Sequence, residues 1–372
     1  MRDGEAMAVA IEAAAGARRR VAPWPHVGAA VVRDGTLVGV GATGPFPEGP
    51  HAEVAALAAA GTAARGATLY TTLEPCNHLR NTPPCTDAVL DAGVSRVVSA
   101  LADPDPLVAG TGFARLRDAG VDVIVGVGAA DAAEQLHSYL HHRRTGRSSC
   151  LLKVATSLDG RIAAPDGSSR WITGEAARAD AHEMRADSQA IIVGSGTALA
   201  DDPELTVRTA GDPAPLRPPL RVLLDAHGRV APAGRLADTA LAPTLVFVTD
   251  RAPGAAVRGW RDAGAEVERV DYVRGRRGGG VDLTAVLTNL GRRGVLQAMV
   301  EGGAFLHGAL LDAGLADRIV VYVGNTMLGA DALGAFGSSG VETIGDAPRF
   351  TLRVVRRLGD DVRLDYAPVG AS

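Results

Sequence analysis

The residues best suited to catalysis in the first half of the sequence are one histidine, two cysteines and one glutamate. His51-Ala52-Glu53 is followed by Pro75-Cys76, and Cys85 comes nine positions after Cys76. One imidazole and two thiolates can hold zinc and leave a fourth position for water, whose pKa the metal lowers to about 7. Glu53 can reach that water and carry its proton to a leaving amine. The pattern predicts a zinc-dependent hydrolytic deamination site.

Two other interpretations of these residues stay open. His78 lies between the cysteines and could close a four-ligand zinc site that is structural and inert. The two cysteines could instead be buried apolar side chains of a core. The first interpretation leaves Glu53 without a role, and the second leaves the neighbouring histidine and glutamate unexplained.

A second candidate site is marked by the only lysine among 38 basic residues. Where nearly every other cation is arginine, Lys153 could be kept because a compact ammonium group that can lose its proton is needed there. The alternative is chance. Lys153 lies on a predicted strand that leads into a turn containing Asp159, and ligands of open α/β sheets bind at the carboxyl ends of strands.

Glycines mark a third feature. Val300-Glu301-Gly302-Gly303 is typical of a strand, a glycine pair and the start of a helix, where backbone N–H groups can bind phosphate. Tight packing is the alternative explanation for this glycine pair. A Gly-x-Gly-x-x-Gly pattern also runs from Gly39 to Gly44, but Pro45 and Pro47 follow where a helix would have to begin, so we do not interpret it as a nucleotide site.

The elements that must position these residues alternate between strands and helices in both halves, which predicts α/β layers. In the first half, a turn at Arg33-Asp34-Gly35 predicts a hairpin. Helices are expected at about 51–60, 84–92 and 130–144, and strands at about 68–73 and 96–101. The polar segment Thr145–Ser149 separates the halves, so we predict domains at residues 1–146 and 150–372.

The second half contains more predicted strands than the first. They are expected at about 150–156, 190–194, 220–225, 244–249, 297–301, 318–323, 350–357 and 361–367. Helices are expected at about 174–187, 254–263, 282–292 and 304–313.

Length and composition limit the class of protein. At roughly 150 residues per domain, 372 residues suggest two domains. A formal net charge of −4 disfavours nucleic acid as a partner. No apolar run is long enough to span a membrane or to direct export, and three cysteines do not form a disulfide framework. We therefore expect a cytoplasmic enzyme that acts on a small molecule.

Several motifs together resemble one known family. They are Thr72-Leu73-Glu74-Pro75-Cys76-Asn77-His78, Thr82-Pro83-Pro84-Cys85, His51-Ala52-Glu53 and the segment from Asp103 to Gly112. With the lysine strand and the glycine turn of the second half, they resemble the bacterial bifunctional deaminase-reductases of riboflavin biosynthesis. The resemblance implies a cytidine-deaminase-like three-layer α/β domain followed by a dihydrofolate-reductase-like α/β domain.

The resemblance also implies two activities and their site residues. Zinc, held by His51, Cys76 and Cys85 with Glu53 as proton donor, would serve deamination of 2,5-diamino-6-(5-phosphoribosylamino)pyrimidin-4-one. NADPH would then reduce the ribosyl group to ribityl. We expect Lys153 and Asp201 to position the sugar or to supply a proton near the reacting carbon. The implied NADPH contacts are Ala155, Trp171, Thr197, Asp201, Gly303, Ala304, Phe305, Leu306, His307, Gly308 and Ala309. The implied substrate contacts are Ser169, Arg185, Leu205, Arg208 and Glu301. Arg185 and Arg208 suit phosphate, although ion pairing on a helix surface also explains Arg185. A homo-oligomer is expected from the resemblance alone.

The sequence departs from the family pattern at several pocket positions. The departures are Trp24, Asn77, Arg80 and Asp105 in the first half and Ala226, where a hydroxyl is common, in the second. They motivate an alternative, a related deaminase-reductase that acts on a different pyrimidine or purine in secondary metabolism. A nucleic-acid-editing deaminase is disfavoured by the acidic net charge and the second half. A non-catalytic zinc and nucleotide-binding module is the remaining alternative.

Overall fold

The computed structural model describes residues 1–79, 82–208, 217–275, 278–337 and 341–370. The chain forms two compact units, Met1–Gly146 and Arg147–Ser372. Among the described residues, no helix is long and apolar enough to cross a membrane.

The first unit is built on a five-stranded mixed sheet with the strand order β2-β1-β3-β4-β5. The strands are β1 (Gly28–Arg33), β2 (Thr36–Ala42), β3 (Thr68–Thr71), β4 (Arg96–Ser99) and β5 (Asp122–Val125). β1 is antiparallel to β2 and β3, whereas β3, β4 and β5 are parallel. Asp34 and Gly35 turn the chain with positive φ angles of 50° and 76°, which confirms the predicted hairpin.

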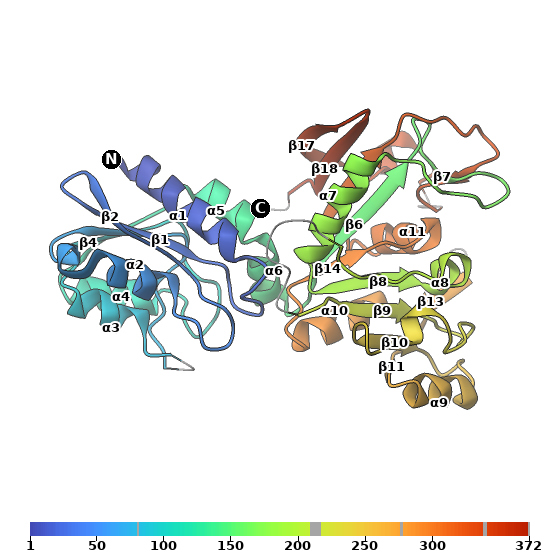
Figure 1. The fold of residues 1–372 in the computed structure, drawn as a ribbon, viewed down its shortest axis with the longest axis horizontal. Helices are drawn as coiled ribbons and strands as arrows, with labels where there is room; N and C mark the ends of the chain where they lie inside the picture. The colour runs from blue at the N-terminus through green and yellow to red at the C-terminus, as the bar shows by residue number, and fades with distance from the viewer. Residues whose placement is uncertain (80–81, 209–216, 276–277, 338–340, 371–372) are drawn as a thin grey trace. The chain divides into compact units, whose positions relative to one another are not determined.

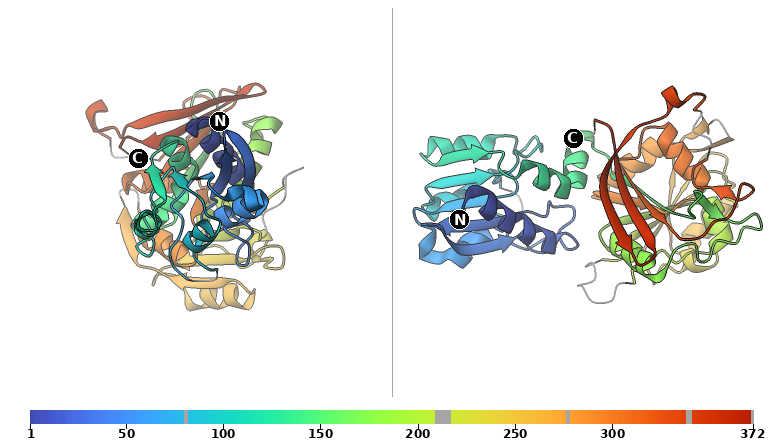
Figure 2. Two further views of the ribbon diagram at one scale, coloured as in Figure 1. Left: turned by 90° about the vertical axis from the view of Figure 1, so that its left-hand side faces the viewer. Right: turned by 90° about the horizontal axis from the view of Figure 1, so that it is seen from above.

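Helices cover both faces of this sheet (Figure 1 and Figure 2). They are α1 (Asp3–Ala17), α2 (Ala52–Ala60), the short 3-10 helix η1 (Gly61–Ala64), α3 (Cys85–Asp91), α4 (Thr111–Asp118), α5 (Ala129–Gln135) and α6 (His137–Thr145). Ala30 of β1 packs with α1, whereas Gly41 of β2, which pairs with Ala29, lies against α2. Because neighbouring residues of a strand point to opposite faces, α1 and α2 lie on opposite sides of the sheet. The predicted three-layer arrangement is confirmed.

Glycines bring β2 close to helix α2. A Cβ atom on Gly39 would lie 2.3 Å from the carbonyl oxygen of Ala56, and one on Gly41 would lie 2.4 Å from the amide nitrogen of Ala56. Only glycine therefore allows the helix backbone to pack this closely. The glycine pattern from Gly39 to Gly44 serves packing, in line with the rejection of a nucleotide site.

Helix α1 was not among the predicted elements. Its buried face is made largely of alanine, and its exposed positions include Ala8 and Gly16, so little contrast in hydrophobicity separates the two faces. The buried positions are Ala6, Met7, Ala10, Ala14 and Ala17. Without such contrast, the periodicity that reveals a helix is weak.

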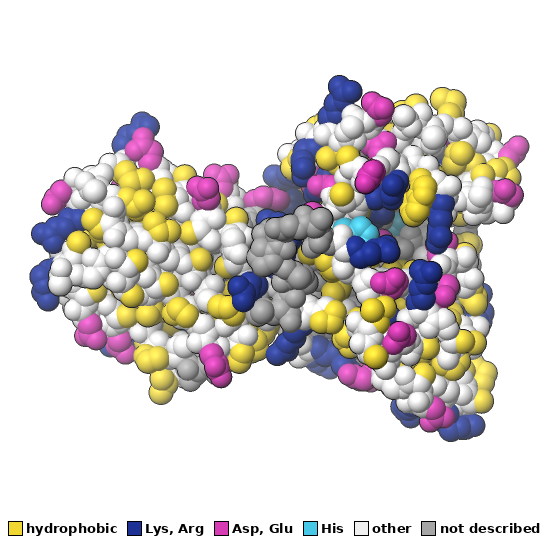
Figure 3. All heavy atoms as spheres, in the orientation of Figure 1, with side chains coloured by type: hydrophobic (Ala, Val, Ile, Leu, Met, Phe, Trp, Pro, Cys, Tyr) yellow, Lys and Arg dark blue, Asp and Glu magenta, His cyan; other side chains and the backbone are white. Residues whose placement is uncertain are grey.

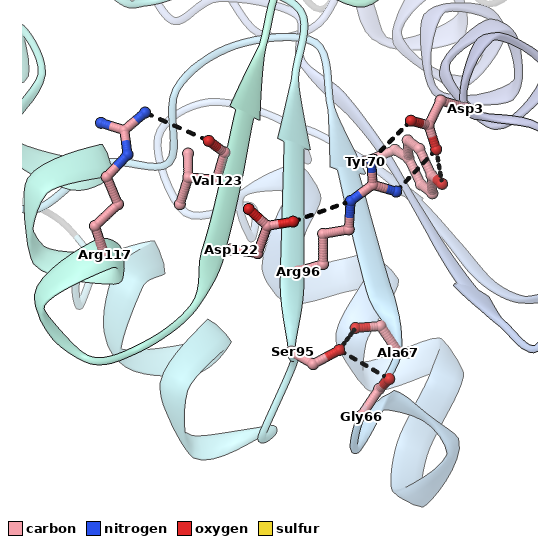
Figure 4. Close-up of polar contacts among 9 residues, drawn as sticks. All are labelled: Asp3, Gly66, Ala67, Tyr70, Ser95, Arg96, Arg117, Asp122 and Val123. Atoms are coloured by element: carbon pink, nitrogen blue, oxygen red, sulfur yellow. Dashed lines mark hydrogen bonds and ion pairs between the residues drawn. The ribbon is translucent and has the colours of Figure 1, made fainter.

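A polar cluster fastens the start of α1 to the sheet (Figure 4). The Asp3 carboxylate accepts hydrogen bonds from the Tyr70 hydroxyl (2.8 Å) and from the Arg96 guanidinium (3.0 and 2.8 Å). Arg96 also lies 3.4 Å from a carboxylate oxygen of Asp122 on β5. The hydrogen bond from Arg96 lowers the pKa of Asp3, so the carboxylate stays charged.

The helix predicted at residues 130–144 is two helices. α5 ends at Gln135 and α6 begins at His137, and Leu136 between them has φ −90° and ψ 9°. Leu136 is fully buried, and its carbonyl oxygen still accepts the amide N–H of Leu140 at 2.9 Å. The chain therefore bends around a buried leucine, which hydrophobic periodicity does not reveal.

The second unit contains a nine-stranded sheet with the order β11-β10-β9-β8-β14-β6-β15-β18-β17. Its strands are β6 (Ser149–Thr156), β8 (Ala190–Gly194), β9 (Leu220–Leu224), β10 (Thr244–Val248), β11 (Glu266–Arg269), β14 (Gln297–Val300), β15 (Arg318–Val323), β17 (Phe350–Leu358) and β18 (Asp361–Pro368). The strands from β11 to β15 are parallel, and β18 and β17 close the sheet as an antiparallel hairpin.

Two small sheets and several helices complete this unit. The small strands are β7 (Arg161–Ala163), β16 (Leu333–Gly334), β12 (Tyr272–Gly275) and β13 (Gly278–Val281). The helices are α7 (Glu175–Ala186), α8 (Ser195–Asp201), η2 (Arg235–Ala237), α9 (Gly254–Asp262), α10 (Leu283–Arg292), α11 (Ala304–Asp312) and η3 (Ile344–Asp346). The four small strands, α8 and β11 were not predicted; they are short, and short elements carry little periodicity.

Each face of the nine-stranded sheet carries its own core. Residues of α7 and α9 pack on one face with alternate residues of β6, such as Leu151. Residues of α10 and α11 pack on the other face with Cys150 and Leu152. The remaining predicted strands and helices of this half are confirmed to within a few residues at their ends.

Candidate functional site

The predicted zinc ligands stand at the ends of elements in the first unit. His51 is the residue that precedes α2, and Cys85 is the first residue of α3. Cys76 lies in the segment that follows β3. Pro84 comes directly before Cys85, where proline suits the start of a helix because an N–H is not needed there. Three separate segments thus bring one ligand each.

The ligand atoms of His51, Cys76 and Cys85 all lie within 4.8 Å of one another. His51 Nδ1 is 3.1 Å from Cys85 Sγ and 3.5 Å from Cys76 Sγ, so Nδ1 is the nitrogen aimed at the thiols. The hydrogen bond from Cys85 lowers the pKa of Cys76 to about 4, which favours a thiolate. One imidazole and two sulfur donors at this spacing fit zinc with a fourth position open.

Glu53 lies beside these ligands in the first turn of α2 and is buried. Its Oε2 atom is 3.6 Å from Cys85 Sγ. Burial raises the pKa of Glu53 to about 7. A carboxyl group with this pKa can both accept and release a proton near neutral pH, which is what a proton shuttle requires.

Two further side chains contact His51 and were not predicted to do so. The Thr82 hydroxyl lies 3.3 Å from His51 Nε2, the nitrogen that faces away from the thiols. The ring of Trp24 meets the imidazole edge to face, with centroids 5.5 Å apart. A partner on the second nitrogen fixes the orientation of a ligating histidine. The position of Thr82 three residues before Cys85 was the only signal for this contact.

His78 is not part of the cluster. Among the described residues, the group of side chains able to share one ion contains His51, Cys76 and Cys85 alone. The Nδ1 atom of His78 is buried without a hydrogen-bond partner. The geometry therefore does not favour the inert four-ligand site that the sequence left open.

The departures from the family pattern have separate structural roles. Asn77 Oδ1 accepts hydrogen bonds from the Thr86 hydroxyl and Arg115, both at 2.9 Å. Asp105 pairs with Arg143 at 3.2 Å. These two residues are held by protein partners, whereas Trp24 lies directly at the ligand cluster. Arg80 lies outside the described residues.

In the second unit, Lys153, Arg185 and Glu301 come together although they are far apart in the sequence. Lys153 is on the face of β6 that packs against α7, because Leu151 and Ala155 on either side of it join the core that contains α7. Arg185 is in the last turn of α7, and Glu301 follows β14. Arg185 Nε and Nη2 donate to the two carboxylate oxygens of Glu301, the second bond at 2.9 Å. Lys153 Nζ lies 4.0 Å from Glu301 Oε2.

The pKa values in this cluster keep Glu301 negatively charged and make it easier for Lys153 to lose its proton. Burial raises the pKa of Glu301, but Arg185 outweighs it and leaves the pKa at about 2. Burial lowers the pKa of Lys153, with Glu301 acting in the opposite direction. Burial, Arg185 and Arg208 lower the pKa of His182 to about 4, so this histidine is neutral. His182, one turn before Arg185 on α7, was not predicted as a site residue.

The predicted substrate residues do not all have a free functional group. Arg185 Nη1 donates to the carbonyl oxygen of Thr206 at 3.0 Å, so three of its nitrogens bind protein acceptors. Arg208 is exposed, and its backbone N–H donates to His182 Nδ1 at 3.3 Å. Leu205 is buried with a positive φ of 54°. Arg208 is therefore a better candidate than Arg185 for binding a phosphate group.

The residues between β7 and α7 lie over the carboxyl ends of β6 and β15. The backbone N–H of Gly174 donates to Asp361 at 2.6 Å, and a Cβ atom on Gly324 would lie 2.0 Å from the carbonyl oxygen of Ile172. Ser169 in this segment is half-buried, and Trp171 is exposed beneath the Arg178 guanidinium, 4.5 Å from the ring centroid. Both residues are thus placed at the edge where a ligand would bind.

The other predicted NADPH contacts follow neighbouring strands. Ala155 is near the end of β6. Thr197 is in α8, and its hydroxyl would lie 3.6 Å from a Cβ atom on Gly303. Asp201 ends α8 and is exposed; its carbonyl oxygen accepts a hydrogen bond from Arg170 at 3.5 Å. Within the described ranges its carboxylate makes no hydrogen bond or ion pair with Lys153.

The segment Gly303–Ala309 forms the start and middle of α11. Gly303 is the residue that precedes the helix, and no side chain caps the helix start. Phe305 and Ala309 are exposed, Leu306 is half-buried, and Ala304, His307 and Gly308 are buried. Uncapped backbone N–H groups beside a glycine fit the phosphates of a dinucleotide such as NADPH. Figure 3 shows that Lys or Arg and His side chains gather on the visible face of this unit.

Comparison with known proteins identifies the domain type of each unit. A family model described as the cytidine and deoxycytidylate deaminase zinc-binding region matches residues 1–101, and the RibD C-terminal domain model matches residues 149–364. The riboflavin biosynthesis protein RibD of Escherichia coli K12 is 40% identical, over 98% of this chain and 99% of its own length. Zinc and NADPH are the cofactors of these two domain types.

Solved structures give the same result over the full chain. Acinetobacter baumannii RibD, form 1, has a TM-score of 0.88 and 37% identity, and the match covers 99% of both chains. A Thermotoga maritima structure described as a diaminohydroxyphosphoribosylaminopyrimidine deaminase/5-amino-6-(5-phosphoribosylamino)uracil reductase has a TM-score of 0.83 and 32% identity, and covers 98% of both chains. The chain therefore belongs to the RibD family of bifunctional riboflavin biosynthesis proteins.

Proposed function

We propose that this chain catalyses two successive reactions on one small molecule. Residues 1–146 deaminate 2,5-diamino-6-(5-phosphoribosylamino)pyrimidin-4-one by hydrolysis, and residues 150–372 then reduce the ribosyl group of the product to ribityl. The observation that carries this proposal is the meeting of His51, Cys76 and Cys85 with the buried Glu53. The second set of site residues, around Lys153, supports the reductive step.

In the first reaction, zinc would be held by His51 Nδ1 and the two thiolates and would lower the pKa of water bound beside it. Glu53 is the group that moves protons. Its carboxylate accepts the proton of the attacking water and delivers it to the departing amine, which leaves as ammonia. The edge-to-face contact with Trp24 and the hydroxyl of Thr82 hold the imidazole in place.

In the second reaction, NADPH would supply the hydride that reduces C1′ of the ribosylamine. The chain contributes Lys153, whose ammonium group lies beside Glu301 and can position the opening sugar or give it a proton. The exposed Arg208 binds the substrate phosphate. The uncapped start of α11 binds the phosphates of the dinucleotide.

The position of Trp24 favours a second candidate function. Its ring lies against the ligand His51 and so stands beside the deaminase site. A related deaminase-reductase that accepts a different pyrimidine or purine would differ from the family at this position. We also propose that the chain is cytoplasmic, which suits free thiols as metal ligands, and that it forms a homo-oligomer, an expectation that rests on the family resemblance.

One experiment tests these proposals together. The zinc-loaded protein is incubated with the diaminopyrimidinone ribosylamine phosphate, and product masses are followed with and without NADPH. Replacement of the amine by oxygen without NADPH, followed by a gain of two hydrogens with it, is the expected result. No change in either mixture, with turnover of another aminopyrimidine or aminopurine, would favour the second candidate.

A further inference from the structure

The placement of the reductase residues indicates where the adenosine half of the cofactor lies. Lys153 on β6 and Glu301 after β14 mark the reacting end, and the start of α11 follows Glu301 directly. β14 has β6 on one side and β8 on the other, and β9 lies beyond β8. A dinucleotide whose phosphates lie at α11 and whose nicotinamide faces Lys153 must therefore extend its adenosine over the ends of β8 and β9. This step rests on the proposed reductase function.

The loop after β9 presents an arginine at this place. β8 and β9 run parallel and end side by side, with α8 beyond the end of β8 (Figure 1). Arg229 is exposed in the loop that follows β9, and its Nη2 atom donates to the hydroxyl of Ser195, the first residue of α8, at 2.6 Å. No carboxylate pairs with Arg229 in the part of the chain that the structure describes. One edge of its guanidinium is thus fixed across the two strand ends.

Asp225, the residue directly after β9, points the other way. It is fully buried, and its Oδ2 atom accepts the backbone N–H of Val230 at 2.7 Å. In dinucleotide-binding sheets, a carboxylate at a strand end binds the ribose 2′-hydroxyl of NAD, whereas an arginine accommodates the 2′-phosphate of NADP. Here the Asp225 carboxylate is buried within the loop and Arg229 is exposed, so the end of β9 presents a positive charge to solvent.

We propose that Arg229 binds the 2′-phosphate of NADPH and sets the preference of the reductase for NADPH over NADH. The planar guanidinium offers several N–H donors to phosphate oxygens. The hydrogen bond to Ser195 already orders the Arg229 side chain, so less conformational entropy is lost when the phosphate binds.

The test compares ligands that differ only in the 2′-phosphate. The full zinc-loaded chain is titrated by calorimetry with NADP⁺ and NAD⁺, and with adenosine 2′,5′-bisphosphate and adenosine 5′-monophosphate. Arg229→Ala is expected to weaken binding of both 2′-phosphorylated ligands by about 10- to 100-fold, and to leave the other two unchanged. Arg293→Ala is the control, because Arg293 pairs with Glu266 and Glu268 of β11 and is expected to have no effect.

Arg229→Lys distinguishes a specific contact from charge alone. We expect it to recover only part of the affinity, because an ammonium group keeps the charge without the paired donors of a guanidinium. An unchanged NADP⁺ affinity in Arg229→Ala, or an equal loss for NAD⁺, would overturn the assignment while the reductase function stands. Wild-type protein that binds none of the four ligands would contradict the reductase function and this assignment with it.

Discussion

Replacement of Arg185 by methionine tests whether the ion pair with Glu301 holds the second unit together. The side chains of Arg185 and Glu301 are only 16% and 12% exposed, so solvent screens their interaction little. Methionine keeps much of the volume of arginine and removes the charge and the hydrogen bonds. Glu301 then keeps Lys153, 4.0 Å away, as its remaining cationic neighbour in the ion pairs of the described residues.

The expected loss follows from the pKa of Glu301. Its ordinary value of 4.5 falls to about 2 in the folded chain, and Arg185 contributes most of that decrease. At roughly 1.36 kcal/mol for each tenfold change, the charged carboxylate is stabilised by about 3 kcal/mol. Arg185→Met should therefore lower the free energy of unfolding of the second unit by about 2 to 3 kcal/mol at pH 7. Because the folded pKa is depressed, this stabilisation is present above pH 4.5 and is lost as pH falls toward 2.

Trp260 provides the assay. It is fully buried in the core between α9 and the nine-stranded sheet, so its fluorescence reports unfolding of the second unit. Trp24 belongs to the first unit, and Trp24→Phe is used as the background in every variant so that its signal does not overlap. Urea unfolding is then measured for this background, Arg185→Met, Glu301→Gln and the double variant.

The double variant is expected to lose less than the sum of the single losses, because it leaves no unpaired buried charge. A difference of about 2 kcal/mol or more between the sum of the single losses and the loss of the double variant would agree with a direct ion pair between Arg185 and Glu301. An unchanged transition in Arg185→Met at pH 7, or losses that simply add, would refute the reasoning. A loss that stayed constant down to pH 3 would also refute it, since the carboxylate would not be its source.

Three further predictions concern the two sites, and a fourth concerns the stability of the first unit. Glu53→Gln should slow ammonia release by roughly 10²- to 10⁴-fold while zinc content, measured by atomic absorption, is unchanged. Lys153→Met should slow reduction of the deaminated substrate by about 10²-fold or more, while the affinity for NADP⁺, measured by calorimetry, is retained. Removal of zinc by a chelator should abolish ammonia release and leave reduction of the deaminated substrate intact. Glu74→Gln should destabilise the first unit by about 2 kcal/mol or more in urea unfolding, followed by Trp24 fluorescence in a background that carries Trp171→Phe and Trp260→Phe. The buried Glu74 carboxylate accepts four backbone N–H bonds of 3.0–3.3 Å, two on each oxygen, and the amide nitrogen of glutamine cannot accept the two bonds on the oxygen that it replaces.

The zinc site could be predicted from the sequence because its chemistry leaves few choices. A histidine, two cysteines and a nearby glutamate at the start of predicted helices have a common explanation in metal chemistry, and the ligand atoms do gather within 4.8 Å. The contact of Trp24 with His51 could not be predicted. It joins residues 27 positions apart, and Trp24 lies in a segment without helix or strand, which no periodicity describes.

The second site was harder to predict because its members come from separate elements. Lys153 stood out only through its rarity, and Arg185 suggested a phosphate ligand. In the structure Arg185 binds Glu301 and the carbonyl oxygen of Thr206 instead. Which acceptor an arginine meets depends on the crossover that brings α7 beside β14, and that pairing of distant elements is not contained in local sequence patterns.

The glycines show the same dependence on context. Gly39 and Gly41 satisfy a nucleotide-binding pattern, yet their missing side chains make room for the backbone of α2. In the pair after β14, a Cβ atom on Gly302 would lie 2.7 Å from the Leu306 side chain, whereas one on Gly303 would meet only the Thr197 hydroxyl at 3.6 Å. Gly302 therefore serves packing, and Gly303 leaves an open approach to the uncapped start of α11. Packing thus explains Gly302, whereas phosphate binding stays a prediction for Gly303. Only the residues that surround each Cα distinguish the two glycines.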